Sequence, residues 1–333
     1  MRIALVLTIK NESRLLLQNI RYHLAIGFEQ IFVYFDGTTD GSDTLVQNME
    51  GVKIANSINA DRYAHHPGMS LFCSTATEYH TARQCLNTYD ALQQCKLMGM
   101  DWLVSLDADE LFLTDKCPIS LNAFFEDCND YDVIQFKTLE VLGRQLHYDF
   151  VMAEETLFKT QKNFLSKWDQ LYFDYWDPYN KKNISLQYWF GHNMGKCAIN
   201  VQSAIVPKNP HRYLMVDGSK PKVKMQGYLL HYNLYDFDDF IKKFTNFKHR
   251  PDTFLSGNNI ETLRKLWLNM VNDPQFDASF LFEYYKKHLW FCPKKVKRLS
   301  KTRYGNFFKR RESAITEITY PKIVLEPFFR KLT

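Results

Sequence analysis

Asp101-Trp-Leu-Val-Ser-Leu-Asp-Ala-Asp-Glu-Leu-Phe-Leu113 is the stretch that decides the fold. Its apolar run, Trp102 to Leu106, predicts a buried strand that ends in the carboxylates Asp107, Asp109 and Glu110. Residues two apart in an extended chain point the same way, so Asp107 and Asp109 could grip one divalent cation. Magnesium or manganese held by one or two carboxylates usually completes its shell with water and a substrate's phosphates. The alternative is an acidic turn after a core strand.

The bulk composition is ordinary for a soluble globular chain. The 333 residues are 45% hydrophobic and 24% charged, enough for one large domain or a domain with an extension. A net charge of +5 is too small to imply nucleic acid, and we expect no specific nucleic-acid partner. The seven cysteines are scattered without CxxC spacing, which indicates reduced thiols rather than a zinc site. With no apolar stretch of transmembrane length, these features predict a cytoplasmic protein.

The chain before the opening stretch predicts the start of an open α/β sheet with right-handed crossovers. Apolar runs indicate its strands, and apolar residues recurring four apart indicate its helices. The expected elements are a strand at Ile3–Leu7, a helix stopped by Gly27, a strand at Gln30–Phe35, a helix at Asp43–Asn48, a strand at Val52–Ala55 and a long helix at Thr75–Met98.

Polar segments follow three of these strands, at Thr8–Glu12, at Asp36 and at Asp107–Glu110. In doubly wound sheets ligands bind beyond the carboxyl ends of the strands. Three polar segments converging on one edge of the sheet therefore predict a ligand site more strongly than any one of them.

Beyond Leu113 the sequence predicts more strands and then a helical C-terminal part. The expected elements are strands at Tyr131–Val141, Gly195–Val201 and Gly227–Tyr232, and helices at Phe237–Phe247, 258–272 and 277–291. The aromatic residues crowded into 142–190 fit either a core or an acceptor cleft that stacks sugar faces on rings. Residues 294–311 carry nine Lys and Arg and no acid, which fits peripheral contact with an anionic membrane, nucleic-acid contact or a solvated surface.

Four motifs carry a family resemblance. They are Leu7-Thr-Ile-Lys-Asn-Glu12, Val33-Tyr-Phe-Asp-Gly-Thr-Thr-Asp-Gly-Ser42, Trp102–Phe112 with its Asp-Ala-Asp-Glu, and Leu230-His-Tyr232 before an Asp-Asp-Phe-Ile-Lys-Lys helix. In this order and spacing they resemble GT-A glycosyltransferases, close to family 2 and most like family 92. The resemblance implies an α/β fold of GT-A type, a mostly parallel twisted sheet flanked by helices with a Rossmann-like nucleotide-binding half.

The resemblance also implies a domain plan. Residues 1–235 are expected to form the glycosyltransferase domain, with a nucleotide-binding half at 1–115 and an acceptor half at 116–235. Residues 236–333 are expected to form a helical C-terminal extension with the basic tail.

By their position in the motifs, Thr8, Lys10, Asn11 and Glu12 stand where relatives contact the nucleoside. Asp36 stands where an aspartate receives a hydrogen bond from uracil or ribose. These roles come from the resemblance alone.

The metal–diphosphate is expected at Asp107 and Asp109, and His231 stands where some relatives offer a further metal ligand; a satisfied core histidine is the alternative. Two residues depart from the family pattern. Phe35 replaces the first aspartate of the usual Asp-Asp pair, and Thr38 replaces a serine. The lost carboxylate leaves the nucleotide base open.

The activity that the resemblance implies is metal-dependent transfer of a sugar from a nucleotide-sugar donor, with UDP favoured, to a hydroxyl of a glycan, glycoprotein or lipid-linked acceptor. Mn²⁺ or Mg²⁺ would neutralise the departing diphosphate. An inverting enzyme, the favoured course, needs a carboxylate to deprotonate the acceptor. Glu154 and Glu155 are the chosen candidates, with plain surface charge as the alternative.

Two other classes of protein remain as alternatives. A nucleotidyltransferase acting on sugar phosphates normally has a glycine-rich loop after its first strand, and Thr8–Ser13 contains no glycine. A non-catalytic carbohydrate-binding protein would be marked by loss of the paired carboxylates, and both are present.

Overall fold

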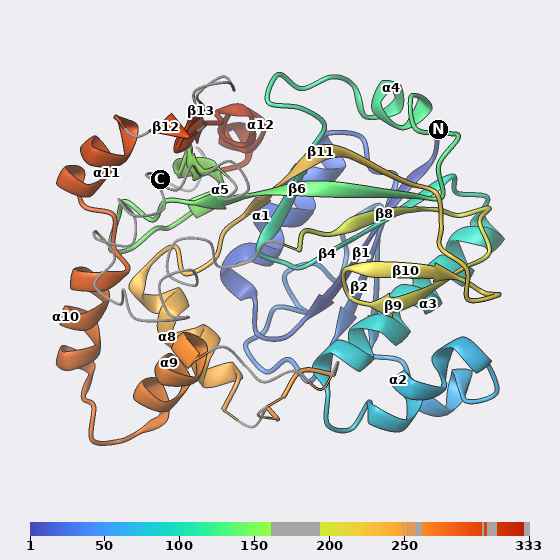
Figure 1. The fold of residues 1–333 in the computed structure, drawn as a ribbon, viewed down its shortest axis with the longest axis horizontal. Coiled ribbons are helices and arrows are strands. Elements are labelled where there is room, and N and C mark those ends of the chain that lie inside the picture. Colours follow the sequence, from blue (N-terminus) through green and yellow to red (C-terminus); the bar gives the residue numbers. More distant parts are fainter. Residues whose placement is uncertain are drawn as a thin grey trace. The chain divides into compact units, whose positions relative to one another are not determined.

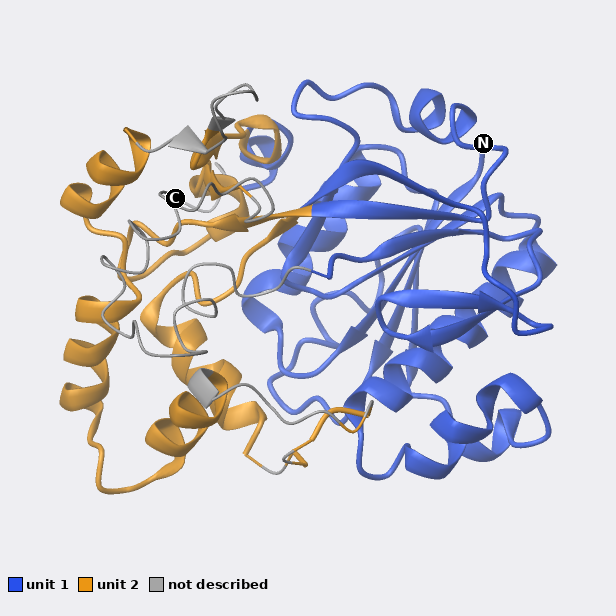
Figure 2. Cartoon of the chain, viewed as in Figure 1, with its two compact units in different colours: residues 1–137, 194–229, 323–333 blue, residues 138–193, 230–322 orange. Residues whose placement is uncertain are grey.

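The computed structural model describes residues 1–160, 194–248, 250–251, 253–255, 257, 262–301, 303–304 and 312–329. The chain divides into two compact units, shown in Figure 2. Unit 1 comprises residues 1–137, 194–229 and 323–333, and unit 2 comprises residues 138–193 and 230–322. The units interleave along the sequence, whereas the predicted domains are consecutive; the predicted boundary at 235 stays a prediction.

Unit 1 is built on a mostly parallel sheet (Figure 1). The strand β1 (Ile3–Ile9) pairs in parallel with β2 (Gln30–Phe35) and β4 (Trp102–Leu106), and β2 pairs in parallel with β3 (Val52–Asn56). On the far side of β4, β8 (Cys197–Asn200) runs antiparallel. Every residue of β1 is buried, as expected for a strand that is covered on both faces.

The two faces of β1 pack into different cores. Leu5 and Leu7 join a cluster with Leu16 and Ile20 of α1 (Ser13–Ala25). Ala4 and Val6 join a second cluster with Ala91 and Leu92 of α3 (His80–Met98). Because successive strand residues point to opposite faces, α1 and α3 must cover opposite sides of the sheet. The predicted α/β class and mostly parallel sheet flanked by helices are confirmed.

Smaller elements complete unit 1. They are the 3₁₀ turns η1 (Ala60–Tyr63) and η2 (Pro67–Met69), α2 (Ser70–Thr75), β5 (Glu110–Leu113), α4 (Leu121–Glu126), the antiparallel pair β9 (Ile205–Asn209) and β10 (Arg212–Met215), the beginning of β6 (Val133–Val141) and most of β11 (Val223–His231). The helix α12 (Tyr320–Phe329) ends in this unit.

One predicted helix is wrong, and another begins later than predicted. Residues 43–48 form successive turns, with Val46 N–H bonded to the Asp43 carbonyl three residues back. So short a segment, with Val46 its only buried apolar residue, does not offset the cost of nucleating a helix. The helix expected from Thr75 to Met98 is present as α3, but it begins at His80 because Tyr79 before it adopts an extended conformation; Thr75 is the last residue of α2.

Unit 2 begins with the last residues of β6. There β6 pairs with β7 (Leu157–Lys159), which pairs with β14 (Ile315–Glu317), both antiparallel. A one-turn helix, α5 (Val151–Glu154), precedes β7. The described residues from 237 onward are mainly helical, as predicted: α8 (Phe237–Asn246), α9 (Thr262–Asn272), α10 (Ala278–His288) and α11 (Pro293–Ser300), followed by the short pair β12 (Arg303–Tyr304) and β13 (Glu312–Ser313).

Aromatic packing and side-chain caps explain the helices of unit 2. Phe240 and Phe244 of α8 pack on Trp267 of α9 and Tyr285 of α10. Asp236 caps α8 by accepting the N–H of Asp239, and Asp277 caps α10 in the same way.

All seven cysteines are free thiols, in agreement with the expected reduced state. Among the described residues, no helix combines the length and the apolarity that crossing a bilayer would require.

Candidate functional site

Polar residues at the carboxyl ends of β1 and β2 share one hydrogen-bond network in unit 1. Asn87 of α3 donates to the hydroxyl oxygens of Thr8 (3.1 Å) and Ser57 (3.0 Å). Ser57 in turn donates to Asp36 Oδ1 at 3.2 Å. The structure thus places Thr8 and Asp36 at one edge of the sheet, linked through α3.

The loops after β1 and β2 are tied together by short polar side chains. Asn11 has a left-handed backbone (φ 56°), and its side-chain oxygen accepts the Thr39 N–H at 2.8 Å. The Thr38 hydroxyl donates to the Ile9 carbonyl at 3.1 Å, so threonine retains the hydroxyl of the serine that it replaces. Glu12 N–H donates to the Ser42 hydroxyl at 3.2 Å. Asn11 and Glu12 therefore shape the loop by these contacts, and Lys10 is exposed beside them.

Asp36 is buried beneath two basic residues of α3, His80 and Arg83, that sequence reasoning missed. Its carboxylate accepts hydrogen bonds from His80 Nδ1 (2.7 Å) and from Arg83 Nε (2.6 Å) and Nη2 (2.9 Å). Burial favours a raised pKa for Asp36, but the bonds from His80 and Arg83 hold this pKa well below its usual range. With the Ser57 contact, both oxygens of Asp36 are occupied. A nucleoside group that donated a hydrogen bond to Asp36 would have to share these oxygens with their present partners. The His80 side chain is 38% exposed and is therefore easier for a ligand to reach.

The predicted cation site is a tight turn after β4. Asp107 N–H donates to Glu110 Oε2 at 2.8 Å, which turns the Glu110 side chain back into the protein. Lys196 donates to Asp107 Oδ1 at 2.9 Å, and Gln84 of α3 donates to the same oxygen. The Lys196 side chain is 1% exposed and that of Asp107 39% exposed, so the ammonium lies behind the carboxylate.

Electrostatics keep this turn ionised. Burial opposes the charge of Asp107, but attraction to Lys196 prevails and lowers the pKa of Asp107 to about 2. Burial likewise opposes the charge of Lys196, while attraction to Asp107 and then to Glu110 raises the pKa of Lys196. Asp107, Asp109 and Glu110 thus set three acidic groups against one buried positive charge. The excess suits a divalent cation.

His211 lies next to this ion pair. Burial, followed by repulsion from Lys196, lowers the pKa of His211 to about 3, so the ring is neutral at physiological pH. Its Nδ1 is 2.8 Å from the Gly195 carbonyl, which accepts the ring proton from that nitrogen. His211 therefore adds no charge to the turn.

The predicted bases, Glu154 and Glu155, lie in unit 2 and differ sharply. Glu155 is 2% exposed and accepts hydrogen bonds from Arg144 Nε (2.9 Å), the Tyr148 hydroxyl (2.7 Å) and the N–H groups of Thr156 and Leu157 (both 2.9 Å). Glu154 is half-buried and accepts from Phe150 N–H at 2.6 Å and Gln145 Nε2 at 3.2 Å. Glu155 is thus fixed by its surroundings, and Glu154 is the more accessible of the pair.

His231 belongs to a buried charged group of unit 2. Glu140 lies 2.9 Å from Lys159 Nζ and 3.4 Å from His231 Nδ1, and all three side chains are buried. Burial favours a raised pKa for Glu140, but Lys159 and His231 pull that pKa well below its usual range. The predicted metal-ligand role of His231 stays a prediction.

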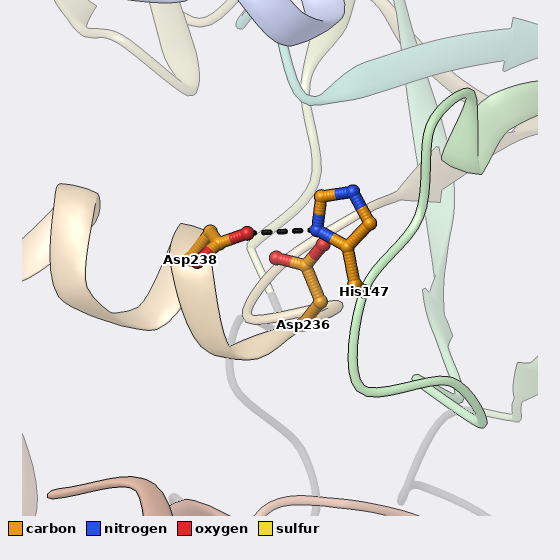
Figure 3. Close-up of side chains that lie close together, drawn as sticks. All are labelled: His147, Asp236 and Asp238. Carbon is orange, nitrogen blue, oxygen red and sulfur yellow. Dashed lines mark hydrogen bonds and ion pairs between the residues drawn. The ribbon is translucent and has the colours of Figure 1, made fainter. Parts of the chain in front are cut away.

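A second group with metal-ligand chemistry lies at the start of α8 (Figure 3). Ligand atoms of His147, Asp236 and Asp238 lie within 4.8 Å of one another, and His147 Nδ1 is 2.8 Å from Asp238 Oδ2. However, Asp236 caps α8 with one oxygen and accepts the Tyr148 N–H with the other, at 3.1 Å. Helix capping and a surface ion pair account for this group.

The basic tail is described over α11. Val296 and Leu299 of this helix pack against Leu142, Phe291 and Ile315 in the core of unit 2. The cations left at the surface are Lys294, Lys297, Arg298 and Lys301. Residues 305–311 and the aromatic residues of 161–193, predicted as a core or an acceptor cleft, lie outside the described residues.

Sequence comparison connects this chain with known proteins. The sequence model of glycosyltransferase family 92 matches residues 8–266. Two proteins of Arabidopsis thaliana, Glycosyltransferase-like At3g57200 and Glycosyltransferase-like At2g41451, are each 24% identical to it, over 237 and 238 residues. The matches cover 67% of this chain but 45% and 52% of the two relatives, so the chain spans about half the length of the curated relatives it matches.

Solved structures with distant likeness include HddC from Yersinia pseudotuberculosis, with a TM-score of 0.33 and 12% identity over 74% of this chain and 100% of that chain. Another is glucosyl-3-phosphoglycerate synthase from Mycobacterium tuberculosis, in complex with Mn²⁺, UDP-glucose and phosphoglyceric acid. Its TM-score is 0.30 at 13% identity, over 70% of this chain and 72% of that chain. Likeness at this level identifies no residue of the site.

Proposed function

The chain belongs to glycosyltransferase family 92, and we propose that it transfers a sugar from a nucleotide-sugar donor to a hydroxyl of a glycan, glycoprotein or lipid-linked acceptor. The observation that carries this proposal is the turn after β4. There Asp107 is ionised at the surface end of a buried ion pair, two residues before Asp109. An acidic pair at the carboxyl end of a central strand is where an α/β sheet binds ligands.

We propose that Asp107 and Asp109 hold Mn²⁺ or Mg²⁺ together with the donor diphosphate. Oxygen ligands on a rigid turn suit either of these hard cations, and the excess negative charge of the turn supports the assignment. The bound ion would supply charge neutralisation for the departing diphosphate. Lys196 keeps Asp107 ionised and oriented, and Glu110 fixes the backbone of the turn through its bond to Asp107 N–H.

The nucleoside is proposed to lie at the neighbouring strand ends, near Thr8, Asn11 and Asp36, with UDP favoured. Asp36 would act mainly through His80 and Arg83, since both of its oxygens are already engaged. His80 is the partner with an exposed edge, so it offers a polar group to a base or ribose without breaking the network.

The acceptor hydroxyl needs a general base if transfer inverts the anomeric centre. Of the two predicted glutamates, Glu154 is proposed for this role. Glu155 would have to give up bonds from Arg144, Tyr148 and two backbone N–H groups before it could receive a proton.

Calorimetric titration of the protein with UDP and Mn²⁺ tests the proposal. Binding is expected for the natural chain and is expected to be lost in Asp109→Asn. The matched control is Asp101→Asn, which removes a carboxylate that caps the other end of the same strand through the Arg2 N–H. Absent binding, or binding that is equal in Asp109→Asn and Asp101→Asn, would contradict the metal–nucleotide site. Release of pyrophosphate from a nucleoside triphosphate would instead favour the nucleotidyltransferase alternative.

A further inference from the structure

A buried polar chain runs from α1 to the backbone of the Asp107–Glu110 turn. Asn19 Nδ2 donates to the Ala108 carbonyl at 3.0 Å and to the Glu110 carbonyl at 2.8 Å. These carbonyls belong to the residues on either side of Asp109. One side-chain amide therefore donates hydrogen bonds to the backbone both before and after a predicted metal ligand.

His23, one helical turn after Asn19, sets the orientation of that amide. Phe112 N–H donates to His23 Nε2 at 3.2 Å, so this nitrogen is an acceptor and the ring proton must lie on Nδ1. Nδ1 is 2.9 Å from both the carbonyl and the side-chain oxygen of Asn19. Donation from Nδ1 leaves the amide nitrogen of Asn19 facing the turn.

Both residues lie in the apolar core. Asn19 and His23 are 0% exposed, and the His23 ring packs edge-on against Phe28, with centroids 5.1 Å apart. Burial lowers the pKa of His23 to about 3, so the ring remains neutral and keeps Nε2 as an acceptor over the working pH range. Burying polar groups in such a core costs free energy unless they are fully hydrogen-bonded. A pair of apolar side chains at these positions of α1 would be buried at a lower cost. The polar pair therefore has a use beyond packing.

We propose that Asn19 and His23 are positioning residues that hold Asp109 in the geometry for a divalent cation and its diphosphate. The inference rests on the proposed function, and it assigns to α1 a part in that site. The relay runs from Phe112 N–H through His23 and Asn19 to both sides of Asp109, so the turn is rigid before a ligand arrives. Partners that orient ligand-bearing groups typically contribute roughly 10–100-fold in metal affinity or activity.

The test measures UDP binding by calorimetry at increasing Mn²⁺ concentration, on folded protein, for Asn19→Ala and His23→Gln. The apparent Mn²⁺ constant is expected to weaken by roughly tenfold or more in Asn19→Ala. His23→Gln is expected to lose less, since glutamine offers both a donor and an acceptor. A merely structural role would reduce the fraction of folded protein and leave that constant unchanged.

Tyr22→Phe is the matched control. The Tyr22 hydroxyl comes from the same helix with the same burial, but its hydrogen bond goes to the Phe112 carbonyl, at 2.9 Å, rather than to a carbonyl beside Asp109. An equal weakening in Tyr22→Phe, or an unchanged constant in Asn19→Ala, overturns the inference. Asn19→Ser serves if Asn19→Ala does not fold.

Hydrogen exchange separates this inference from the proposed function. If the natural chain binds no UDP with any metal, the proposed function fails on its own. The amides of residues 107–112 are still expected to exchange faster in Asn19→Ala than in Tyr22→Phe. Equal exchange in the two variants would show that Asn19 does not hold the turn.

Discussion

Lys196 Nζ lies 2.9 Å from Asp107 Oδ1, and the two residues differ sharply in exposure. The cation is sealed inside unit 1 while the anion reaches the surface, so Lys196 cannot meet a ligand without leaving its place. It acts as a fixed counter-ion that offsets the desolvation cost of the partly buried Asp107 carboxylate at the end of β4.

Removing this counter-ion is expected to cost stability. Lys196→Met should lower the free energy of unfolding by about 2 kcal/mol, less than for a fully buried pair because Asp107 is partly solvated. Urea unfolding measures the change. The double variant Lys196→Met/Asp107→Asn should recover most of the loss, and failure of that recovery would mean that Lys196 stabilises the fold by some other contact.

The same ion pair predicts a pH dependence. The folded pKa of Asp107 is about 2, below its unfolded value of about 4, so its stabilisation is complete above pH 4 and is lost as pH falls towards 2. Asp107→Asn should therefore show a shallower decline of unfolding free energy between pH 4 and 2. Parallel urea series for the two proteins across this window test the prediction, and identical slopes would contradict it.

The two glutamates of unit 2 are expected to separate function from stability. Glu154→Gln should lower kcat roughly 10²–10⁴-fold while leaving the melting temperature and UDP binding near their natural values. Glu155→Gln should instead lower the melting temperature, because it removes the buried charge that faces Arg144. Thermal unfolding and a sugar-transfer assay on both variants distinguish the two roles. Normal transfer by Glu154→Gln would contradict the assignment of Glu154 as the base.

Arg83 and His80 should contribute unequally at Asp36. Arg83→Met removes two bonds to a carboxylate that is 6% exposed and should destabilise the protein by roughly 2 kcal/mol. His80→Ala removes one bond from a more exposed side chain, so it should change UDP affinity more than stability. Calorimetry and urea unfolding on both variants test this, and the opposite ranking would place the nucleoside elsewhere.

The surface of α11 predicts how any membrane contact would behave. Its apolar residues pack into the core of unit 2, so attraction to anionic lipid would come from exposed cations alone. Binding to vesicles containing phosphatidylserine is expected at low salt and should vanish at about 0.5 M salt, where screening is strong. Lys297→Glu/Arg298→Glu should abolish it. Salt-resistant binding, or none at low salt, would contradict the electrostatic contact.

Local patterns were enough to predict the strands and the acidic turn. The run Trp102–Leu106 is mostly apolar on both faces, which predicts a buried strand with Asp107 at its end. The partners of the turn were harder, because Lys196 lies 89 positions away in the sequence. Likewise, Asp36 is bound by Arg83, which lies 47 positions away in the sequence.

One missed signal was present in the sequence. Asn19 and His23 are four residues apart, beside the apolar stripe of Leu16 and Ile20, and polar side chains in that position need buried partners. The pattern could have predicted a polar chain inside unit 1. It could not have identified the carbonyls of Ala108 and Glu110 as the other end of that chain.

The borders between the two units have a practical consequence for modularity. Two of them fall after residues 137 and 229, inside β6 (Val133–Val141) and β11 (Val223–His231) rather than in loops. A piece excised at these borders would carry severed strands with unsatisfied backbone groups, which invite aggregation. We therefore do not expect unit 1 to be exchangeable between relatives as a single block, and recombination among them should succeed only at crossover points outside these two strands.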